Sequence, residues 1–471
     1  MKEAAIPLYA AIADPGSLTP FGAEFEPGNP SAWPGYAVEL SRARRATGAR
    51  HAVTTGFATI GGERCVLIGF EFAFLGGSMG TAEGARISRA FTTAIGERLP
   101  VVCIAASGGA RLQEGASALL QMQGVAAAVA AARQAGIPFA AVAGDPTTGG
   151  VWASLVAAAD VVIGVDRARI SFSGSRTRPA DAADDSPEYH AAAKWQHGYL
   201  DVLAPADQVA GRLAAFISLL APGSRGSGER LDPALPGPAA RAAEVRPASP
   251  AWRSGSAAGS RDGRSRDGWS QVTATRRAGR ARADRWLAWY FDRCFEIRGD
   301  RCGGVDRGLR CGFGSRNGQT IGYIAQSGQA TTAAGYRTAI RLMGLAERFG
   351  RPVLTLVDTP GAAAAPDDER AGIGTAIAES LVAMATSRVP VTTVVIGEGV
   401  SGGALAIASP ADLWISRDAY LSVTSPEFAV SILKREEADI AQVAGLLRLT
   451  PADLARRGLV RGILAPPGDD V

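Results

Sequence analysis

Two halves of the chain follow the same pattern of apolar runs and glycine turns. In the first half, one apolar run ends in a glycine turn at 101–110 and another at 139–150. The same succession returns at 353–362 and 391–403. A buried strand, a turn of small residues and a helix, repeated in this order, indicate a parallel sheet covered by helices on both faces. The pattern predicts two related α/β domains in tandem.

Length and composition agree with two domains. The chain has 471 residues, of which 47% are hydrophobic and 20% charged. A single hydrophobic core rarely grows past about 250–300 residues, so each half is expected to form its own core. We predict an irregular N-terminal segment at 1–34, an N-domain at 35–222, a flexible linker at 223–283 and a C-domain at 284–471.

The predicted linker has the composition of a flexible segment. Gly, Pro, Ser, Arg and Ala dominate it, and it contains the arginine-rich stretch Arg276–Arg282. Such a composition buries too little apolar surface to order itself. We interpret the arginines as a solvated basic stretch, because a nucleic-acid site would show a basic patch on a folded motif. No nucleic-acid partner is predicted.

Cysteine usage and hydropathy exclude further classes of protein. The five cysteines form neither a disulfide framework nor a Cys-x-x-Cys metal pattern. The sequence shows no secretory signal pattern and no apolar run of membrane-spanning length. We therefore expect a cytoplasmic protein with no metal and no membrane partner.

The glycine turns are the candidate reactive positions. Glycine lets the backbone approach a ligand closely, and the helix that follows adds its positive N-terminal end. Two N–H donors that converge on a thioester carbonyl oxygen stabilise the enolate formed when a bond at the alpha carbon is made or broken. We predict such donors at Gly108, Gly109, Ala110, Gly149 and Gly150 in the N-half, and at Gly361, Ala362, Gly402 and Gly403 in the C-half. The Gly149-Gly150 and Gly402-Gly403 turns are expected to superpose.

Side chains of the usual catalytic kinds are scarce near these turns. The chain has only three histidines, His51, His190 and His197, and none of them lies in the repeated turns. Ser401, next to Gly402, is an alternative nucleophile. We favour electrostatic stabilisation by backbone N–H groups over a nucleophile or a metal.

Longer motifs carry a resemblance to a known family. The stretches 70–80, Ala106–Glu114 and 145–151 resemble the beta subunit of bacterial acetyl-CoA carboxylase carboxyltransferase. The alpha subunit of that enzyme is similar to the stretches 335–337, 341–349, 358–362, 397–406 and 425–427. The resemblance covers residues 35–221 and 285–471, so the chain resembles a beta–alpha fusion.

The resemblance implies a fold, a reaction and partners. It implies two crotonase-like domains, in a homodimer or larger assembly with active sites between an N-domain and a C-domain. The family moves a carboxyl group from carboxybiotin, on a separate biotin carboxyl carrier protein loaded by a biotin carboxylase, to the alpha carbon of an acyl-CoA. No Met-Lys-Met biotin-attachment stretch occurs here, so these partners would be separate proteins.

The resemblance also implies roles for the motif residues. Gly149 and Gly150 match the residues that hold one oxyanion, and Gly402 and Gly403 match those that hold the other. Substrate-binding roles fall on Gly76, Gly77, Gly108, Gly109, Ala110 and Arg111 in the N-half, and on Gly361 and Ala362 in the C-half. The N-half would take the CoA thioester and the C-half would take biotin.

Departures from the family pattern keep other functions open. Residues 1–34 contain none of the cysteines of the family's zinc ribbon, and Ser327 replaces a usual lysine. Ala363, Val400 and Phe428 also differ from the family's residues, and we expect these changes to crowd the biotin side. A biotin-independent decarboxylase of malonyl-type CoA or acyl carrier protein thioesters is therefore an alternative. A catalytically silent binding subunit is another, although a scaffold has no need of four open glycine turns.

Overall fold

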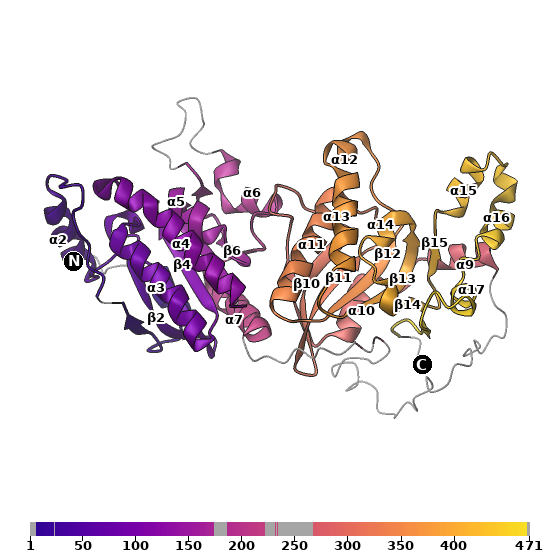
Figure 1. Ribbon diagram of the computed structural model, residues 1–471, viewed down its shortest axis with the longest axis horizontal. Helices are drawn as coiled ribbons and strands as arrows, with labels where there is room; N and C mark the ends of the chain where they lie inside the picture. The colour runs from indigo at the N-terminus through magenta and orange to yellow at the C-terminus, as the bar shows by residue number, and fades with distance from the viewer. Residues whose placement is uncertain are drawn as a thin grey trace. The chain divides into compact units, whose positions relative to one another are not determined.

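The chain folds into two compact units. The computed structural model describes residues 6–22, 24–173, 186–221, 231, 233 and 267–468 (Figure 1). Unit 1 comprises Met1–Ser224 with Ile297–Val305, and unit 2 comprises Arg225–Glu296 with Asp306–Val471. In the described part of the chain, no helix combines the length and apolar character that a membrane span needs.

Unit 1 is built on a single sheet. Its strands lie in the order β1, β2, β3, β4, β5, β6, β8, and β7 pairs with β5. Their bounds are Thr19–Phe21 (β1), Val53–Ile60 (β2), Glu63–Phe70 (β3), Val101–Ser107 (β4), Phe139–Thr148 (β5), Val161–Val165 (β6), Ile170–Ser171 (β7) and Val202–Ala204 (β8). β2 is antiparallel to both of its neighbours, β1 and β3, and all later pairs are parallel.

Helices cover both faces of this sheet. They are Leu8–Ile12 (α1), Tyr36–Thr47 (α2), Thr81–Glu97 (α3), Ala116–Gln134 (α4), Gly149–Val151 (α5), Ala191–Gln196 (α6) and Val209–Leu220 (α7). On one face, α3 and α4 lie side by side (Figure 1) and bury Phe91 and Val125 against Val66 and Cys103 of the strands. Every residue of β4 is buried, which is why the strand reads as an unbroken apolar run.

The first residues of the chain are more regular than predicted. The segment predicted to be irregular contains helix α1, and its strand β1 pairs with β2. Tyr9 of α1 lies over Gly69 of β3, where a Cβ atom would come within 2.3 Å of the Tyr9 Cγ. The missing side chain at Gly69 makes room for the ring, and this packing orders the segment.

Unit 2 repeats the strand order of unit 1. Its strands lie in the order β9, β10, β11, β12, β13, β14, β16, which matches the order of unit 1 strand by strand. β15 pairs with β13 as β7 pairs with β5. The bounds are Arg293–Ile297 (β9), Leu309–Arg316 (β10), Gln319–Gln326 (β11), Val353–Thr359 (β12), Val391–Val400 (β13), Leu413–Ser416 (β14), Tyr420–Ser422 (β15) and Ile463–Leu464 (β16). The predicted tandem of related α/β domains is confirmed.

The helices of unit 2 also pack on both faces. They are Gly268–Thr275 (α9), Ala283–Tyr290 (α10), Ala333–Arg348 (α11), Pro366–Arg370 (α12), Ile373–Ala385 (α13), Ser401–Leu405 (α14), Pro426–Ile432 (α15), Ile440–Leu446 (α16) and Pro451–Arg456 (α17). Trp286 of α10 packs on the face that holds Leu354 and Ile396. On the other face, Leu342 and Ala346 of α11 approach Gly322 of β11.

The C-terminal part of the predicted linker is folded. Residues 222–230, 232 and 234–266 lie outside the described residues, but helix α9 begins at Gly268 and buries Gln271 and Val272. The side chain of Asp267 caps this helix by accepting the Ser270 N–H at 2.8 Å. Unit 2 therefore begins, as a folded structure, before the predicted boundary at residue 284.

A short segment of the predicted C-domain belongs to unit 1. Within that unit, the Arg298 guanidinium lies over the Trp195 ring, 4.1 Å from its centroid. Arg301 forms an ion pair of 2.6 Å with the buried Asp201. A Cβ atom at Gly299 would lie 2.3 Å from the Gly198 Cα, so both backbones pack without side chains at this point.

Candidate active site

In the N-half, the turns after β4 and β5 lie against each other. The two strands pair with Ala105 opposite Ala143, and a register shift then brings Ser107 opposite Thr147. Gly109 and Gly149 follow with φ of +108° and +62°. A Cβ atom at Gly149 would lie 3.1 Å from the Gly109 Cα, so this close approach needs glycine.

Hydrogen bonds within the fold use most of the N–H groups that the sequence singled out. Gly108 donates to the Gly76 carbonyl (2.9 Å) and Gly149 to the Phe172 carbonyl (3.0 Å). Gly109 donates to the Ser107 hydroxyl at 3.0 Å. These three N–H groups shape the turns and are not available to a ligand.

Ala110 and Gly150 are the remaining candidates for N–H donors at these turns. The Gly109 carbonyl accepts the Met79 N–H (2.8 Å), and the Arg111 N–H donates to the Met79 carbonyl (2.9 Å). Because successive N–H groups of an extended segment point to opposite edges, the Ala110 N–H points away from Met79. Gly150 lies in the first turn of α5, where an N–H has no acceptor earlier in its own helix.

The C-half builds the same arrangement. Gly361 donates to the Thr359 hydroxyl (3.2 Å), while its carbonyl accepts the Thr331 N–H (3.2 Å). The Ala363 N–H donates to the Thr331 carbonyl (2.9 Å), so the Ala362 N–H points to the opposite edge. Gly402 is in the first turn of α14, and a Cβ atom there would meet nothing within 4 Å. Ala362 and Gly402 are the C-half counterparts of Ala110 and Gly150.

The glycine pairs of the two halves do not superpose as predicted. Thr359 pairs with Gly399 as Ser107 pairs with Thr147, and Ser401 has the φ of +62° that Gly149 has. Gly150 therefore corresponds to Gly402, and the prediction was wrong by one residue. The two glycine pairs are required for different reasons. Gly149 adopts the left-handed conformation, whereas Gly403 makes a close contact with another backbone segment. A Cβ atom at Gly403 would lie 2.4 Å from the Ala362 nitrogen.

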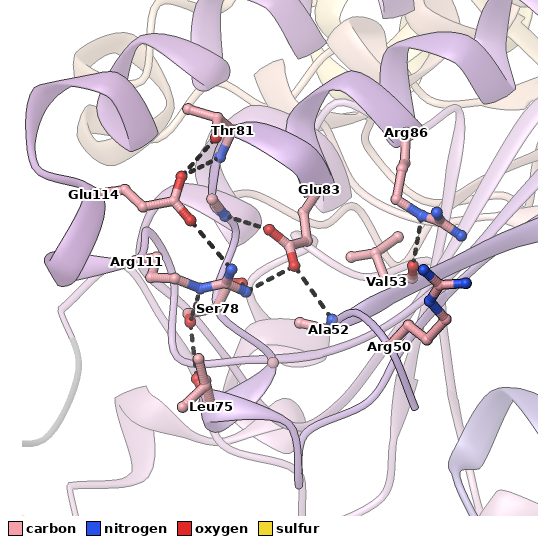
Figure 2. A network of polar contacts seen from close by, with 12 residues as sticks. Arg50, Ala52, Val53, Leu75, Ser78, Thr81, Glu83, Arg86, Arg111 and Glu114 are labelled. Carbon is pink, nitrogen blue, oxygen red and sulfur yellow. Dashed lines mark hydrogen bonds and ion pairs between the residues drawn. The ribbon is translucent and has the colours of Figure 1, made fainter. Parts of the chain in front are cut away.

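Arg111 braces the N-half turn from inside the protein. Its side chain is fully buried and lies between Glu83 (2.8 Å) and Glu114 (3.2 Å), as Figure 2 shows. The remaining donors reach the Ser78 carbonyl (2.6 Å), the Ser78 hydroxyl (3.2 Å) and the Tyr36 hydroxyl (3.1 Å). All five N–H donors of the guanidinium are engaged. The resemblance implies that Arg111 binds the substrate. In the structure, Arg111 is instead buried within the protein, where it fixes the turn that carries Ala110.

The two predicted glycines before α3 also support this turn. A Cβ atom at Gly77 would lie 2.1 Å from the Ala106 carbonyl oxygen. The Gly76 carbonyl accepts the Gly108 N–H, and the Gly77 carbonyl accepts the Ser107 hydroxyl at 2.7 Å. Both residues thus lie beneath the turn after β4.

Arginines from the segment before α10 brace the C-half turns. One terminal nitrogen of Arg280 donates to both carboxylate oxygens of the buried Asp358, at 2.8 and 3.0 Å, and the other donates to the Ile396 carbonyl at 2.7 Å. Arg276 lies 3.1 Å from Glu398, which also accepts the Tyr420 hydroxyl at 2.6 Å. The interpretation of these arginines as a solvated stretch was wrong, because they pair with carboxylates at the ends of β12 and β13.

Burial and charge act in opposite directions on the Asp358 carboxyl. Burial raises the pKa of Asp358, while the neighbouring Arg280 opposes this rise. The backbone N–H of Glu398 also donates to Asp358, at 3.1 Å. The carboxylate thereby connects the end of β12 to the end of β13.

Two further side chains hold the carbonyl of Gly403. The Tyr336 hydroxyl donates to it at 3.0 Å and the Gln326 amide at 3.3 Å. Burial raises the pKa of Tyr336, so its hydroxyl keeps the proton that it donates. Tyr336 and Gln326 were missed in the sequence analysis, because the sequence does not indicate which group a polar side chain within an apolar helix or strand will bond to.

The side chains near the turns provide few reactive groups. Among the described residues, no cluster of His, Cys, Asp and Glu has the arrangement of a metal site. All three histidines belong to the sequence of unit 1, so unit 2 contains none. Ser401 lies in the stretch Gly399–Gly403, which reads Gly-x-Ser-x-Gly at a strand-to-helix turn. Its hydroxyl accepts the Gly403 N–H at 3.3 Å.

Comparisons with known proteins agree with this architecture. Residues 30–199 match the carboxyl transferase domain family, and residues 264–469 match the acetyl co-enzyme A carboxylase carboxyltransferase-like family. The acetyl-coenzyme A carboxylase carboxyl transferase subunits beta/alpha of Salinispora arenicola are 37% identical, over 97% of this chain and 81% of that protein. A probable biotin-dependent acyl-coenzyme A carboxylase beta3 subunit of Mycobacterium bovis is 30% identical, over 97% of this chain and 88% of that protein.

Solved structures share the fold. The transcarboxylase 12S matches with a TM-score of 0.76 at 21% identity, covering 98% of this chain and 86% of that one. A single-chain, multi-domain long-chain acyl-CoA carboxylase matches with a TM-score of 0.73 at 21% identity, covering 98% of this chain and 44% of that one. The tandem of crotonase-like domains is thus confirmed, and the chain belongs to the acetyl-CoA carboxylase carboxyltransferase family, with its beta and alpha parts in one polypeptide.

Proposed function

We propose that this chain is the carboxyltransferase component of a biotin-dependent acyl-CoA carboxylase, which moves a carboxyl group from biotin to the alpha carbon of an acyl thioester. The observation that carries the proposal is the pair of adjacent turns that each unit builds in the same way, with backbone N–H groups that we assign as donors. Carboxyl transfer between two carbonyl compounds needs two such sites, because negative charge develops on an oxygen of each compound during the reaction.

In the N-half, the N–H groups of Ala110 and Gly150 would hold the thioester oxygen. When the alpha proton leaves, this oxygen becomes an enolate oxygen, and donors fixed by Arg111 and Ser107 need no rearrangement to stabilise it. Met122 of α4 lies over Gly150, where a Cβ atom would come within 2.9 Å of its sulfur. An apolar cover of this kind strengthens the hydrogen bonds beneath it by excluding water.

In the C-half, the N–H groups of Ala362 and Gly402 would hold the ureido oxygen of biotin. Val400, which replaces a family glycine, is only 2% exposed and packs with Val272, Tyr420 and Leu449. Its side chain is therefore taken up by a small core beside α9. The Phe428 side chain is 67% exposed. These placements favour carboxyl transfer over the decarboxylase alternative, whose main support is a crowded C-half.

The proposed partners follow from the reaction. Biotin would arrive on a separate carrier protein, and a biotin carboxylase would load that carrier. A homodimer or larger assembly is part of the proposal. Exposed apolar side chains of each unit, such as Leu112 and Leu120 in unit 1 and Ile432 in unit 2, offer surface for subunit contacts.

The proposal is tested with malonyl-CoA in the presence and absence of free biotin. Acetyl-CoA is expected to form in a biotin-dependent way, with a carboxyl group appearing on biotin, and mass spectrometry follows both products. A Gly150→Val variant, with bulk added beneath Met122, is expected to lose this activity while remaining folded. Loss of CO2 from malonyl-CoA at full rate without biotin would replace transfer with the decarboxylase function.

A further inference from the structure

The corresponding turns of the two halves differ at the residue with the left-handed conformation. Gly149 and Ser401 follow the corresponding strands β5 and β13, and both have φ of +62°. Glycine adopts this left-handed conformation freely, whereas residues with a side chain seldom adopt it. Left-handed residues with a side chain also occur at ordinary turns and helix ends of this chain, such as Arg98 and Asn317, but strained residues of this kind cluster at sites that bind a ligand. The serine therefore calls for a reason that the N-half glycine does not need.

The Ser401 hydroxyl lies between the two turns of the C-half. A Cβ atom at Gly361 would come within 3.3 Å of the Ser401 oxygen, which places this oxygen against the turn after β12. On its other side, the oxygen accepts the Gly403 N–H at 3.3 Å. A hydroxyl that accepts one hydrogen bond still has its own proton to donate. Among the described residues, this proton has no acceptor.

We propose that the Ser401 hydroxyl is a third hydrogen-bond donor of the C-half site, acting with the Ala362 and Gly402 N–H groups on the ureido oxygen of biotin. This inference rests on the function proposed above. Two nitrogen atoms release electron density into a urea oxygen, so it accepts hydrogen bonds more strongly than a thioester oxygen does. A site with three donors therefore suits a urea, and the two-donor N-half site, with Gly149 at the matching position, suits a thioester.

The surroundings of Ser401 favour a donor over a nucleophile. The Gly-x-Ser-x-Gly stretch gives it the backbone of a nucleophile elbow, but a serine nucleophile also needs a base that takes its proton. Unit 2 contains no histidine, and the hydrogen bond observed at the hydroxyl is one that it accepts. The elbow thus presents a hydroxyl to the ligand without activating it for attack.

The test compares Ser401→Gly, Ser401→Ala and the wild type in the biotin-dependent conversion of malonyl-CoA to acetyl-CoA. Ser401→Gly removes the hydroxyl and relieves the left-handed strain, so it is expected to keep or raise the melting temperature. Because loss of one oxyanion donor lowers kcat by about 10²–10³-fold, we expect turnover to fall by at least about tenfold in both variants. The KM for malonyl-CoA is expected to stay within about twofold, because the N-half donors remain.

A control and two contrary outcomes complete the experiment. Ser431→Ala removes an exposed serine hydroxyl from α15 and is expected to leave both turnover and stability unchanged. Wild-type turnover in Ser401→Gly would overturn the inference while leaving the proposed function intact, and so would an acyl adduct on Ser401 detected by mass spectrometry. A wild-type enzyme with no biotin dependence would instead overturn the proposed function, and the inference with it.

Discussion

The turns of the N-half and of the C-half have the same backbone arrangement, but different arginines support them. In the N-half, the brace is Arg111, which follows directly after the donor residue Ala110 and bonds to Glu83 and Glu114. In the C-half, the brace is Arg280, which comes from the segment before the repeated fold and pairs with Asp358. The geometry of the N–H donors is kept, while the side chains that hold it are not. This agrees with the proposed function, in which the reaction constrains where the N–H donors point but not which side chains support them.

The spaces above the two sites also differ. Met122 lies over Gly150, whereas Gly402 faces open space. The C-half carries a hydroxyl at Ser401 where the N-half has the bare backbone of Gly149. An apolar, covered site and an open, more polar site are suited to different ligands.

The largest expected effect follows from removing the buried brace of the N-half. Arg111→Met would leave the Glu83 and Glu114 carboxylates buried without a cation, which costs about 3–5 kcal/mol of unfolding free energy. Arg169→Met is the control, because its ion pair with Asp145 is about half exposed on both sides and is worth less than about 1 kcal/mol. Denaturant unfolding measures both variants. Equal stability of the two would contradict the bracing role.

The second prediction concerns the glycines of the two halves. Gly403→Ala places a Cβ atom 2.4 Å from the Ala362 nitrogen, so the donor must move. Loss of one oxyanion donor lowers kcat by about 10²–10³-fold. Gly150→Ala should cost less, because its Cβ atom meets the flexible end of Met122 at 2.9 Å. Turnover of malonyl-CoA with free biotin measures the difference.

Gly374→Ala is the control for these glycine variants. Gly374 lies in α13, and a Cβ atom there meets nothing within 4 Å. Alanine in a helix is favoured over glycine by up to about 1 kcal/mol, so this variant should be as active and at least as stable as the wild type. If Gly150→Ala were the more damaging of the two site variants, the assigned difference between the halves would be reversed.

The sequence was sufficient for the backbone of the site. Apolar runs that end in small residues predicted β4 and β5 in unit 1, β12 and β13 in unit 2, and the turns that follow them. Parallel strands buried on both faces are apolar along their whole length, which makes them easy to recognise in a sequence. The repeat also predicted that the turns of each half come together. It misplaced the C-half pair by one residue, since Gly402 and Gly403 look alike in a sequence although only Gly403 lies against Ala362.

The supporting side chains could not be predicted in the same way. Arg111 and Arg280 are charged residues, which are seldom buried, and the carboxylates that pair with them are distant in sequence or unmarked by any local pattern. A signal was available for α9, where Asp267 precedes an apolar Trp269 and Val272 in the manner of a capped helix. This signal was missed in the sequence analysis because the predicted linker was judged by its average composition.

The third prediction tests the brace of the C-half. Arg280→Met should lower the unfolding free energy by about 2–3 kcal/mol. This is somewhat less than the loss expected when a buried carboxylate is left with no partner at all. Asp358 would keep the Glu398 N–H at 3.1 Å and the more distant Arg282 at 3.6 Å. Arg388→Met, at a pair that is 87% exposed on the arginine side, is the control and should change little. A neutral Arg280→Met would mean that the strand ends need no cation.

The smallest predicted effect is a sensitivity to acid that belongs to unit 1. His51 is 6% exposed, and burial, followed by the nearby Arg86, lowers its pKa to about 4. In the unfolded chain, His51 has its ordinary pKa of about 6.5, so it binds a proton at pH values where the folded unit does not. Stability present at neutral pH is therefore lost as the pH falls from about 6.5 towards about 4. We expect a loss of about 1–2 kcal/mol by pH 5, since one pKa unit corresponds to about 1.4 kcal/mol.

The matching variant is His51→Gln, which is neutral at every pH and should remove this part of the acid dependence. Unfolding of the wild type and the variant at pH 7 and pH 5 measures the effect as a difference of differences. Carboxyl groups contribute equally to both proteins and cancel. Unit 2 has no histidine, so its unfolding transition should show no such difference between the two proteins. A variant that loses as much stability as the wild type would show that His51 is protonated in the folded protein, and the contrast between the two units would then rest on their braces alone.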